Sequence, residues 1–400
     1  MKILYLVNMN ENNRKGLFTV AHERIKEMIK SGTVEDYDIY SIQFWDVGIR
    51  NFLKKIMGKT TTAKGSDKFE YENVEYKKIY LKTGLFSKLI ERTNFDVIRY
   101  LPFLKKYEEV IKSCDVVSVP WGYPHGRIGY WINKLYKKPY IVTYYGSDIH
   151  TMPYQKKHIK KKINEVMDNA YFNMFVSNGL YENAKELGYK KDNYMVINNG
   201  VNPDKFYTID EEEIDEIKKK INLSGEIIGF TGNLNTVKRA DKLIEIFDHI
   251  NIISKEEVSF LVVGDGPLRE GMEKDAKDKN LNIFFSGNVK VDDVRNYMNV
   301  MDMMLLPSRN EGFGCVVLEA NACGTRVIGS DVGGICEAVR NDELIVSEGD
   351  DFELRMAKKT VDILSQSYDK NKLIEDVKNG FTWSAIAQHE INVYKGVQNE

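Results

Sequence analysis

The stretch from Leu305 to Glu319, LLPSRNEGFGCVVLE, is the most informative part of this chain of 400 residues. Its apolar start predicts a buried strand that ends at Pro307. A loop with two glycines follows, and a helix is then expected to run to Cys323, with Gly324 as its C-terminal stop. The loop therefore follows the carboxyl end of a strand, which is where α/β proteins bind their ligands.

Two kinds of group in this stretch suit a phosphorylated sugar. Gly312 and Gly314 let a ligand approach the backbone, and N–H groups at a helix N-terminus favour a diphosphate. Glu311 is placed to accept hydrogen bonds from sugar hydroxyls. Glu319 lies roughly 8 Å further along the helix at ~1.5 Å per residue, so the two carboxylates suit the two ends of an extended ligand. The alternative for Glu319 is an ordinary solvated helix residue.

Short apolar strands alternate with helix-period segments on both sides of this stretch. The N-terminal strands are expected at 3–7, 115–119, 140–143 and 175–177, and the C-terminal strands at 227–230, 260–263, 283–285, 303–306 and 327–328. This alternation is typical of βα units with parallel sheets. It stops between Asn202 and Gly225, where Pro203 and an acidic run lie. We therefore expect an α/β protein of two doubly wound, Rossmann-like domains, 1–203 and 225–380, joined by a hinge at 204–224.

Composition excludes several classes of protein. With 42% hydrophobic and 29% charged residues, the chain is expected to be globular, and its net charge of −2 argues against a general nucleic-acid binder. The first 200 residues nevertheless carry a net charge of +11 and the last 200 a net charge of −13. The N-terminal apolar run is too short for a signal peptide, and no stretch is long enough to span a membrane. The four cysteines lack metal-site spacing, so a cytoplasmic protein with reduced thiols is expected.

Glu311 and Glu319 form a Glu-x7-Glu motif in the context EGFGCVVLEANACGTRVIGSDVGGICEAV, which closely resembles the retaining glycosyltransferases of family 4. Further segments carry the resemblance: VINNGV at 196–201, FTGNL at 230–234, VGDGP at 263–267 and FSGNV at 285–289. The resemblance implies the GT-B fold. It also implies that residues 381–400 form a last helix that returns to pack on the N-terminal domain.

The resemblance also implies roles for individual residues. Glu319 would bind the ribose hydroxyls and Glu311 the donor sugar, and Lys238 would neutralise the leaving diphosphate. The amides of Phe313, Gly314 and Cys315 would take sugar and phosphate oxygens. The remaining donor contacts would come from Gly16, Gly232, Asn288 and Val289. A cation at Lys238 is also favoured by its loop beyond a strand, although an ordinary surface lysine is the alternative.

Two positions depart from the family pattern. Asn233 stands where an arginine usually follows the phosphate-loop glycine, and Arg239 is expected to supply the missing charge. Tyr145 stands where a histidine usually precedes Gly146, and tyrosine cannot act as a base near neutral pH. Tyr145, Asp148 and His125 are the expected acceptor-side residues. For His125, a structural role at a helix start is an equal alternative.

The family mechanism implies retention of the anomeric configuration without an enzymic nucleophile, with the leaving phosphate taking the acceptor proton. A UDP-sugar donor is expected from the family, and a glycan or lipid-linked acceptor in surface polysaccharide or glycolipid synthesis. No cofactor or metal site is expected. The Asp36-Tyr37-Asp38 sequence has the form of a metal-binding DxD motif, but it precedes a predicted strand at the end of the sheet away from ligands.

The basic N-terminal half suggests contact with an anionic membrane. The segment 49–59 places apolar residues on one helical face and lysines or arginines on the other, 154–163 adds five lysines, and 85–90 is a third candidate. The alternative is that all three are core-facing helices with solvated charges. Peripheral association with the inner face of the plasma membrane is therefore one expectation for this cytoplasmic chain.

Two other functions remain open from the sequence. One is a GT-B-fold epimerase of sugar nucleotides, which would need no acceptor. The other is a non-catalytic protein that binds membrane or nucleic acid through the basic half, although no stacking platform for nucleic acid is visible.

Overall fold

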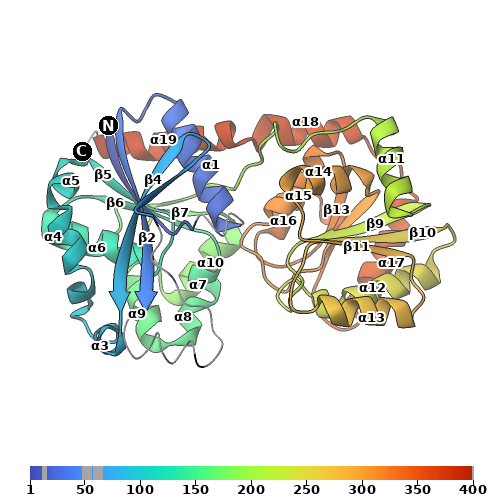
Figure 1. The fold of residues 1–400 in the computed structure, drawn as a ribbon, viewed down its shortest axis with the longest axis horizontal. Helices are drawn as coiled ribbons and strands as arrows, with labels where there is room; N and C mark the ends of the chain where they lie inside the picture. The colour runs from blue at the N-terminus through green and yellow to red at the C-terminus, as the bar shows by residue number, and fades with distance from the viewer. Residues whose placement is uncertain (11–15, 47–55, 57–65, 399–400) are drawn as a thin grey trace. The chain divides into compact units, whose positions relative to one another are not determined.

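The computed structural model describes residues 1–10, 16–46, 56 and 66–398. The chain forms two compact units. The first unit contains 1–176, 180–197 and 387–400, and the second contains 177–179 and 198–386. Each is a sheet of mostly or wholly parallel strands with helices packed on it (Figure 1).

The first unit has an eight-stranded sheet in the order β3-β4-β2-β1-β5-β6-β7-β8. Its strands are parallel except for β3, which pairs with β4 in the antiparallel direction. The strand bounds are β1 Lys2–Val7, β2 Asp36–Asp46, β3 Lys68–Tyr71, β4 Val74–Thr83, β5 Val116–Val119, β6 Tyr140–Tyr144, β7 Phe172–Phe175 and β8 Tyr194–Val196. The helices are α1 Leu17–Lys30, α3 Leu85–Ile90, η1 Asp96–Arg99, α4 Leu101–Lys106, α5 Glu108–Ser113, α6 His125–Tyr136, α7 Ser147–His150, α8 Met152–Gln155, α9 Lys157–Asn169, α10 Asn178–Leu187 and α19 Trp383–Gln398.

The second unit has a six-stranded, wholly parallel sheet in the order β11-β10-β9-β12-β13-β14. The strands are β9 Glu226–Thr231, β10 Val258–Val263, β11 Ile283–Gly287, β12 Met303–Leu306, β13 Arg326–Ser330 and β14 Ile345–Val346. The helices are α11 Glu211–Ile221, α12 Ala240–Ile253, α13 Arg269–Asp278, α14 Val291–Val300, α15 Cys315–Ala322, α16 Ile335–Val339, α17 Phe352–Leu364 and α18 Lys370–Gly380, with a short η2 at Asp342–Leu344. Helices cover both faces, with α12, α13 and α17 on one and α14 and α15 on the other (Figure 1).

The expected α/β architecture is confirmed, and the strand after Asn169 differs in position. Strand β7 covers Phe172–Phe175, whereas the sequence predicts a strand at 175–177. The polar residue Asn173 interrupts the apolar pattern by which a buried strand is recognised in the sequence. It is fully buried, and its amide donates hydrogen bonds to the Met167 carbonyl and the Tyr189 hydroxyl.

The segment 204–224, expected to be a hinge, contains a helix of the second unit. Helix α11 packs against α14, and its Ile221 is buried. Asp210 caps the helix by accepting a hydrogen bond from the Glu213 amide over 2.9 Å. The acidic run therefore forms the first helical turn, where the helix dipole stabilises carboxylates.

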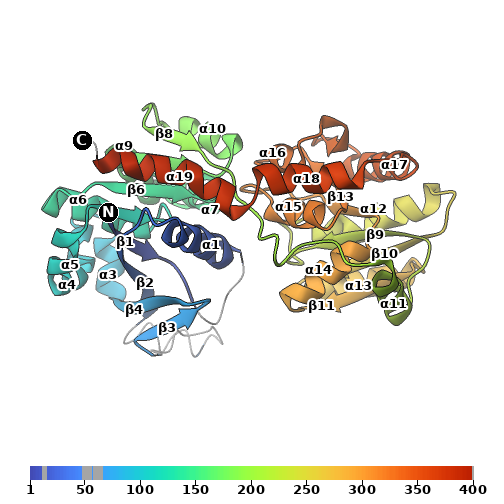
Figure 2. The same cartoon turned by 90° about the horizontal axis from the view of Figure 1, so that it is seen from above.

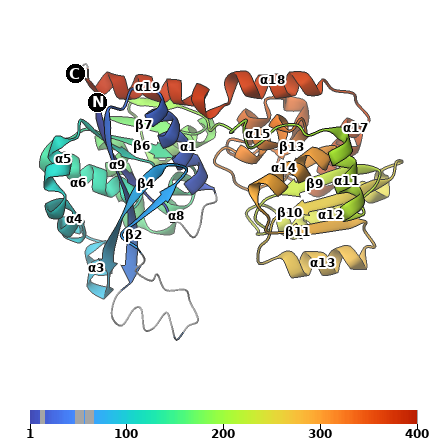
Figure 3. The same cartoon turned by 45° about the horizontal axis from the view of Figure 1, so that its top comes forward.

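The end of the chain returns to the first unit, as expected, and lies beside α1 (Figures 2 and 3). The buried carboxylate of Glu390 on α19 pairs with the buried Arg24 guanidinium on α1, which also donates to the Ile197 carbonyl over 2.9 Å. Tyr394 hydrogen-bonds Ser118 of β5 over 2.6 Å. These contacts fix α19 on the first unit, since a buried charge is tolerated only when it is paired.

Replacing Glu390 with alanine is expected to destabilise the first unit by about 3–5 kcal/mol, because the buried Arg24 charge loses its partner. The measurement is the free energy of unfolding in urea, followed by signals from the first unit. Gln388→Ala, at an exposed position of the same helix, is the matched control and should change stability by less than about 0.5 kcal/mol. Equal effects of the two substitutions would contradict the assignment.

Candidate functional site

The site in the second unit is built on glycines at the carboxyl ends of its strands. Gly232 follows β9, and its N–H donates to the Val263 carbonyl over 2.9 Å. Gly264 follows β10 at φ 135°, and a Cβ added there would lie 1.9 Å from the Gly232 carbonyl oxygen. Its N–H donates to Gly287 at the end of β11 over 3.1 Å. Side chains at these positions would force the strand ends apart, so the glycines create the rim on which the loops meet.

The loop after β12 is fixed by the loop after β13. Gly334 donates its N–H to the Glu311 carbonyl over 3.3 Å. A Cβ on Gly333, at φ 55°, would lie 1.9 Å from that same carbonyl oxygen. Ser330 donates a hydrogen bond to the Ser308 carbonyl over 2.6 Å. The backbone of Glu311 is thus held from a neighbouring strand, which fixes where its side chain begins.

Glu311 and Lys238 are brought together from loops 73 residues apart. The Lys238 ammonium forms an ion pair with the Glu311 carboxylate, and both side chains are partly exposed. The Lys238 amide donates to the Asn235 side chain over 3.0 Å, which orders the loop after β9. The predicted sugar-binding acid and the predicted phosphate-binding cation therefore share one place at the strand ends.

Arg309 is a residue of this site that the sequence analysis missed. Its guanidinium makes two hydrogen bonds to the Asp241 carboxylate, at 2.6 and 2.9 Å, and a third to the Thr236 carbonyl at 2.6 Å. Its own N–H donates to the Val237 carbonyl over 2.8 Å. Arg309 thereby ties the Glu311 loop to the Lys238 loop. The only sequence signal was an arginine two residues before Glu311.

Helix α15 begins beside Glu311 and presents its first-turn amides there. Gly314 is the N-cap residue in the left-handed region, at φ 96°, and Gly312, Phe313 and Gly314 are all buried. The first N–H groups of a helix have no acceptor within the helix. The loop predicted to bind an anion therefore has the expected local structure, with Cys315 as the first helical residue.

Glu319 lies on α15 and is only partly exposed. No residue in the described ranges pairs with its carboxylate. Removal of water by the surrounding protein raises the pKa of this carboxyl to about 7. A half-buried acid without a cation or a donor is suited to receive hydroxyl groups from a ligand.

Arg239 follows Lys238 directly, but its side chain pairs with carboxylates other than Glu311. It has a left-handed backbone conformation at φ 54°, and its buried guanidinium stacks 3.7 Å from the Phe352 ring centre. It pairs with Glu348 at 2.5 Å and Glu353 at 3.4 Å. Its positive charge is thus paired with two carboxylates in this structure, and its contact with the diphosphate stays a prediction.

The other expected donor contacts are surface loop positions. Asn233 is exposed after β9, and its side-chain oxygen lies beside Gly266. Asn288 is exposed and Val289 half-buried in the loop between β11 and α14. In the first unit, Gly16 is the exposed N-cap residue of α1 at φ 55°, with open space where a Cβ would be.

The expected acceptor-side residues of the first unit differ in accessibility. Tyr145 is half-buried, with the Arg24 guanidinium 5.7 Å from its ring centre. Asp148 is buried and accepts hydrogen bonds from the amides of Gly122, Tyr145 and Gly146 at 3.0 to 3.3 Å. Burial raises its pKa to about 6 against those hydrogen bonds. Asp148 thus holds the turn on which Tyr145 lies.

His125 has the structural role that the sequence left as an alternative. It is the first residue of α6, is 1% exposed, and donates from Nε2 to the Ile42 carbonyl over 2.9 Å. Burial lowers its pKa to about 4, so it is neutral at physiological pH. The burial and the hydrogen bond favour the structural alternative, and contact with an acceptor stays a prediction.

The Asp36-Tyr37-Asp38 sequence begins β2 and is engaged in ion pairs. Lys2 lies 2.8 Å from Asp36, and Lys77 lies 2.7 Å from Asp38. Within the described ranges, no three His, Cys, Asp or Glu side chains are grouped as metal ligands. Metal independence of the reaction stays a prediction.

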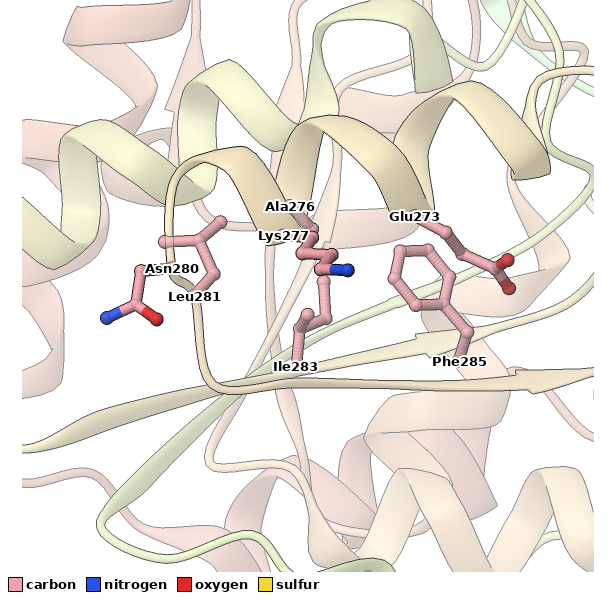
Figure 4. Close-up of a pocket in the computed structure, with 7 residues that line it drawn as sticks. All are labelled: Glu273, Ala276, Lys277, Asn280, Leu281, Ile283 and Phe285. Carbon is pink, nitrogen blue, oxygen red and sulfur yellow. The ribbon is translucent and has the colours of Figure 1, made fainter.

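A separate pocket of about 460 Å³ lies between α13 and the edge strand β11 (Figure 4). Its lining residues are Glu273, Ala276, Lys277, Asn280, Leu281, Ile283 and Phe285. None of them is a candidate site residue, because the pocket lies under α13 along the sheet edge and not at the glycine rim.

Comparison with known proteins finds a family that the second unit of the chain resembles. Residues 211–379 match the family described as "Glycosyl transferases group 1". This region of the chain, 169 of its 400 residues, is similar to the group 1 glycosyltransferases. This family of transferase enzymes agrees with the function class predicted from the Glu-x7-Glu context. The narrower membership of family 4 stays a prediction.

Individual relatives support the family and the fold. The chain is 27% identical over 223 residues, 55% of its length, to the putative teichuronic acid biosynthesis glycosyltransferase TuaC of Bacillus subtilis, and the alignment spans 54% of that protein. The sucrose-phosphate synthase structure from Thermosynechococcus elongatus superposes with a TM-score of 0.75 at 17% identity, covering 100% of both chains. The Anabaena HepE structure with UDP and glucose gives a TM-score of 0.71 at 15% identity, covering 99% of this chain and 100% of that one. These structures confirm the expected GT-B fold of two Rossmann-like units.

The position of Glu319 predicts a stability change with pH. Because folding raises its pKa to about 7, the protein loses stability as the pH rises from the usual carboxyl range to about 7. Glu319→Gln, which cannot ionise, should raise the free energy of unfolding at about pH 8 by about 1–2 kcal/mol, allowing for partial exposure. At about pH 4 the gain should vanish.

Urea unfolding at the two pH values provides the measurement. Glu375→Gln, at an exposed position of α18, is the control and should leave stability unchanged at both. A Glu319→Gln protein no more stable than the parent at the higher pH would show that the carboxylate is compensated.

Proposed function

We propose that this chain transfers a sugar, with retention of configuration, from a UDP-sugar to a glycan or lipid-linked acceptor in surface polysaccharide or glycolipid synthesis. The observation that carries the proposal is the uncompensated carboxylate of Glu319, eight residues after the ion-paired Glu311 on the same loop and helix. The Glu319 carboxylate is suited to accept hydrogen bonds from hydroxyl groups, while the Glu311 carboxylate lies beside a cation and a helix N-terminus. That combination fits a molecule with ribose at one end and a sugar diphosphate at the other.

In this proposal the Lys238 ammonium exchanges its ion pair with Glu311 for an ion pair with the diphosphate of the ligand. The incoming diphosphate attracts the Lys238 ammonium, and the first-turn amides of α15 donate to sugar and phosphate oxygens. Glu311 is then released to accept hydrogen bonds from the donor sugar. Glu319 binds the ribose hydroxyls, and the base lies against the backbone at Asn288 and Val289.

The reaction exchanges one bond to the anomeric carbon for another on the same face of the sugar. The bond to the diphosphate oxygen breaks, and the bond to the acceptor oxygen forms. The acceptor proton passes to the departing phosphate, which carries the electron pair of the broken bond. Lys238 and the α15 amides stabilise the charge that develops on this leaving group. Glu311 is assigned to sugar binding and not to nucleophilic attack.

The relatives support the choice of donor and pathway. TuaC of Bacillus subtilis is described as a putative teichuronic acid biosynthesis glycosyltransferase. HepE was solved with UDP and glucose. An epimerase of the same fold would instead convert a UDP-sugar without any acceptor, so analysis of the products formed from UDP-sugar alone distinguishes the two reactions.

Glu319→Ala is expected to weaken binding of UDP-glucose at least tenfold, because the ribose hydroxyls lose a charged acceptor. Calorimetry or protection against thermal unfolding measures the affinity. Glu375→Ala is the control for an exposed glutamate of the same unit. If Glu319→Ala retains the parental affinity for each UDP-sugar that protects the parent protein, the ribose assignment fails.

Lys238→Ala is expected to lower turnover about 100-fold or more, since a preorganised charge on the leaving group is lost. UDP release from the UDP-sugar that gives the greatest thermal protection provides the assay. Lys238→Arg should recover part of the rate. Lys242→Ala, which removes a partly exposed lysine paired with Glu245 on α12, should leave turnover unchanged. Equal rates for Lys238→Ala and Lys242→Ala would exclude Lys238 from the reaction.

A further inference from the structure

Helix α3 and the 3-10 helix η1 of the first unit expose four large apolar side chains. Phe86 is 72% exposed and Leu89 58%, and they lie three residues apart on α3. Phe95 is 71% exposed and Ile98 47%, again three residues apart, and the Ile98 amide donates to the Phe95 carbonyl over 3.1 Å. Residues at this spacing share one side of either helix type. Because α3 packs beside η1, the two apolar pairs lie on neighbouring elements.

Local hydrogen bonds hold these side chains outward. Ser87 and Gly84 bond to each other reciprocally at 2.9 Å and begin α3. Thr93 ends the turn after α3 by donating from its hydroxyl to the Ile90 carbonyl over 2.8 Å. Ile90 and Tyr100 are buried and anchor the segment at both ends. An ordered surface that presents several large apolar groups marks an interaction site.

The exposed charges beside these groups are basic. Lys88 and Arg92 belong to the same segment and are exposed. Lys161 of α9 is exposed and donates to the Asn94 side chain over 3.1 Å, which places it beside the turn. We call Phe86, Leu89, Phe95 and Ile98, together with Lys88, Arg92 and Lys161, the α3–η1 face.

The two acids of the same segment are neutralised within the protein. Glu91 accepts a hydrogen bond from the Tyr123 hydroxyl at 2.5 Å and lies 3.5 Å from the Arg99 guanidinium. Asp96 is fully buried and pairs with Arg127 at 2.8 Å and Lys162 at 2.5 Å. The negative charges are thus directed inward, and the charge left at the surface is positive.

The three segments predicted to contact a membrane differ in the apolar surface that they expose. For 49–59, the structure describes only Ile56, so this prediction lies outside the described residues. In 154–163, α8 ends at Gln155 and α9 starts at Lys157. The apolar side of α9, with Ile159 and Ile163, is buried against the protein, so α9 offers charge and no apolar surface. In 85–90 the apolar side chains of Phe86 and Leu89 are exposed.

We infer that the α3–η1 face docks on an anionic membrane surface. Apolar side chains would enter the lipid interface, and Lys88, Arg92 and Lys161 would meet anionic headgroups. A second copy of the chain fits less well, because two faces of equal positive charge repel each other. Docking itself does not depend on the proposed function. Only its benefit does, because docking would bring the enzyme to a lipid-linked acceptor. No helix in the described part of the chain is long and apolar enough to cross a bilayer, so this contact would be peripheral.

Sedimentation of the full chain with lipid vesicles tests the inference. Vesicles of phosphatidylcholine alone are compared with an equimolar mixture of phosphatidylcholine and phosphatidylglycerol. The parent protein should bind the anionic vesicles and not the neutral ones, and added salt should weaken the binding. The double variants Phe86→Ser/Phe95→Ser and Lys88→Glu/Arg92→Glu should each reduce the bound fraction at least tenfold.

The controls remove similar groups from the second unit. Ile252→Ser replaces an apolar side chain that is 68% exposed on α12, and Lys274→Glu/Lys358→Glu reverses two exposed charges. Neither should alter vesicle binding. Each variant's thermal unfolding and its protection by UDP-sugar are measured alongside, so a loss of fold or of donor binding is separated from a loss of docking.

Three results would overturn the inference. The first is a parent protein that does not bind anionic vesicles, and the second is binding that survives both double variants. The third is a concentration-dependent dimer that only Phe86→Ser/Phe95→Ser abolishes, which would make the face a contact between copies. Vesicle binding without sugar transfer would uphold the docking face and reject the transferase proposal, and the reverse outcome would reject only the face.

Discussion

The candidate site depends on backbone contacts that only glycine permits. Gly264 approaches the Gly232 carbonyl, and Gly333 approaches the Glu311 carbonyl, so closely that a Cβ at either place would lie 1.9 Å from oxygen. These contacts bring the ends of separate strands together before any side chain takes part. The Lys238–Glu311 pair and the start of α15 are consequences of that arrangement, since both stand on the loops that the glycines fix. The position of the reactive groups at this rim therefore depends first on glycines, whose lack of a side chain lets the loops approach each other.

The sequence predicted the features that depend on local pattern. Apolar runs ending in glycine or asparagine located the strands around the site, and the Gly-x-Gly loop with Gly324 located α15 closely. Glu311 and Lys238 were predicted as site residues because they lie in loops beyond strand ends, and the structure brings the two together. Glu319 was predicted from the resemblance of the Glu-x7-Glu motif. The pattern also predicted the return of the last helix to the first unit, through the family resemblance.

What the sequence could not predict was the choice of partners far along the chain. Arg239 follows Lys238 directly, yet its backbone turns into the left-handed region and its charge goes to Glu348 and Glu353, more than a hundred residues away. Arg309 acts through Asp241, 68 residues earlier. His125 is buried with its ring hydrogen-bonded to the Ile42 carbonyl of β2. Helical periodicity in α9 could not say whether its apolar side faces lipid or the core, because both environments select the same pattern.

The helix α19 makes the first unit discontinuous in sequence. The Arg24 guanidinium and the Ser118 hydroxyl find their partners only at Glu390 and Tyr394, after the whole second unit has been inserted between them. During synthesis the ribosome therefore releases all strands of the second unit before it releases the part of α19 that completes the first unit. The N-terminal residues must wait for the last ones, so the order in which the two units can finish folding is the reverse of the order in which translation begins them.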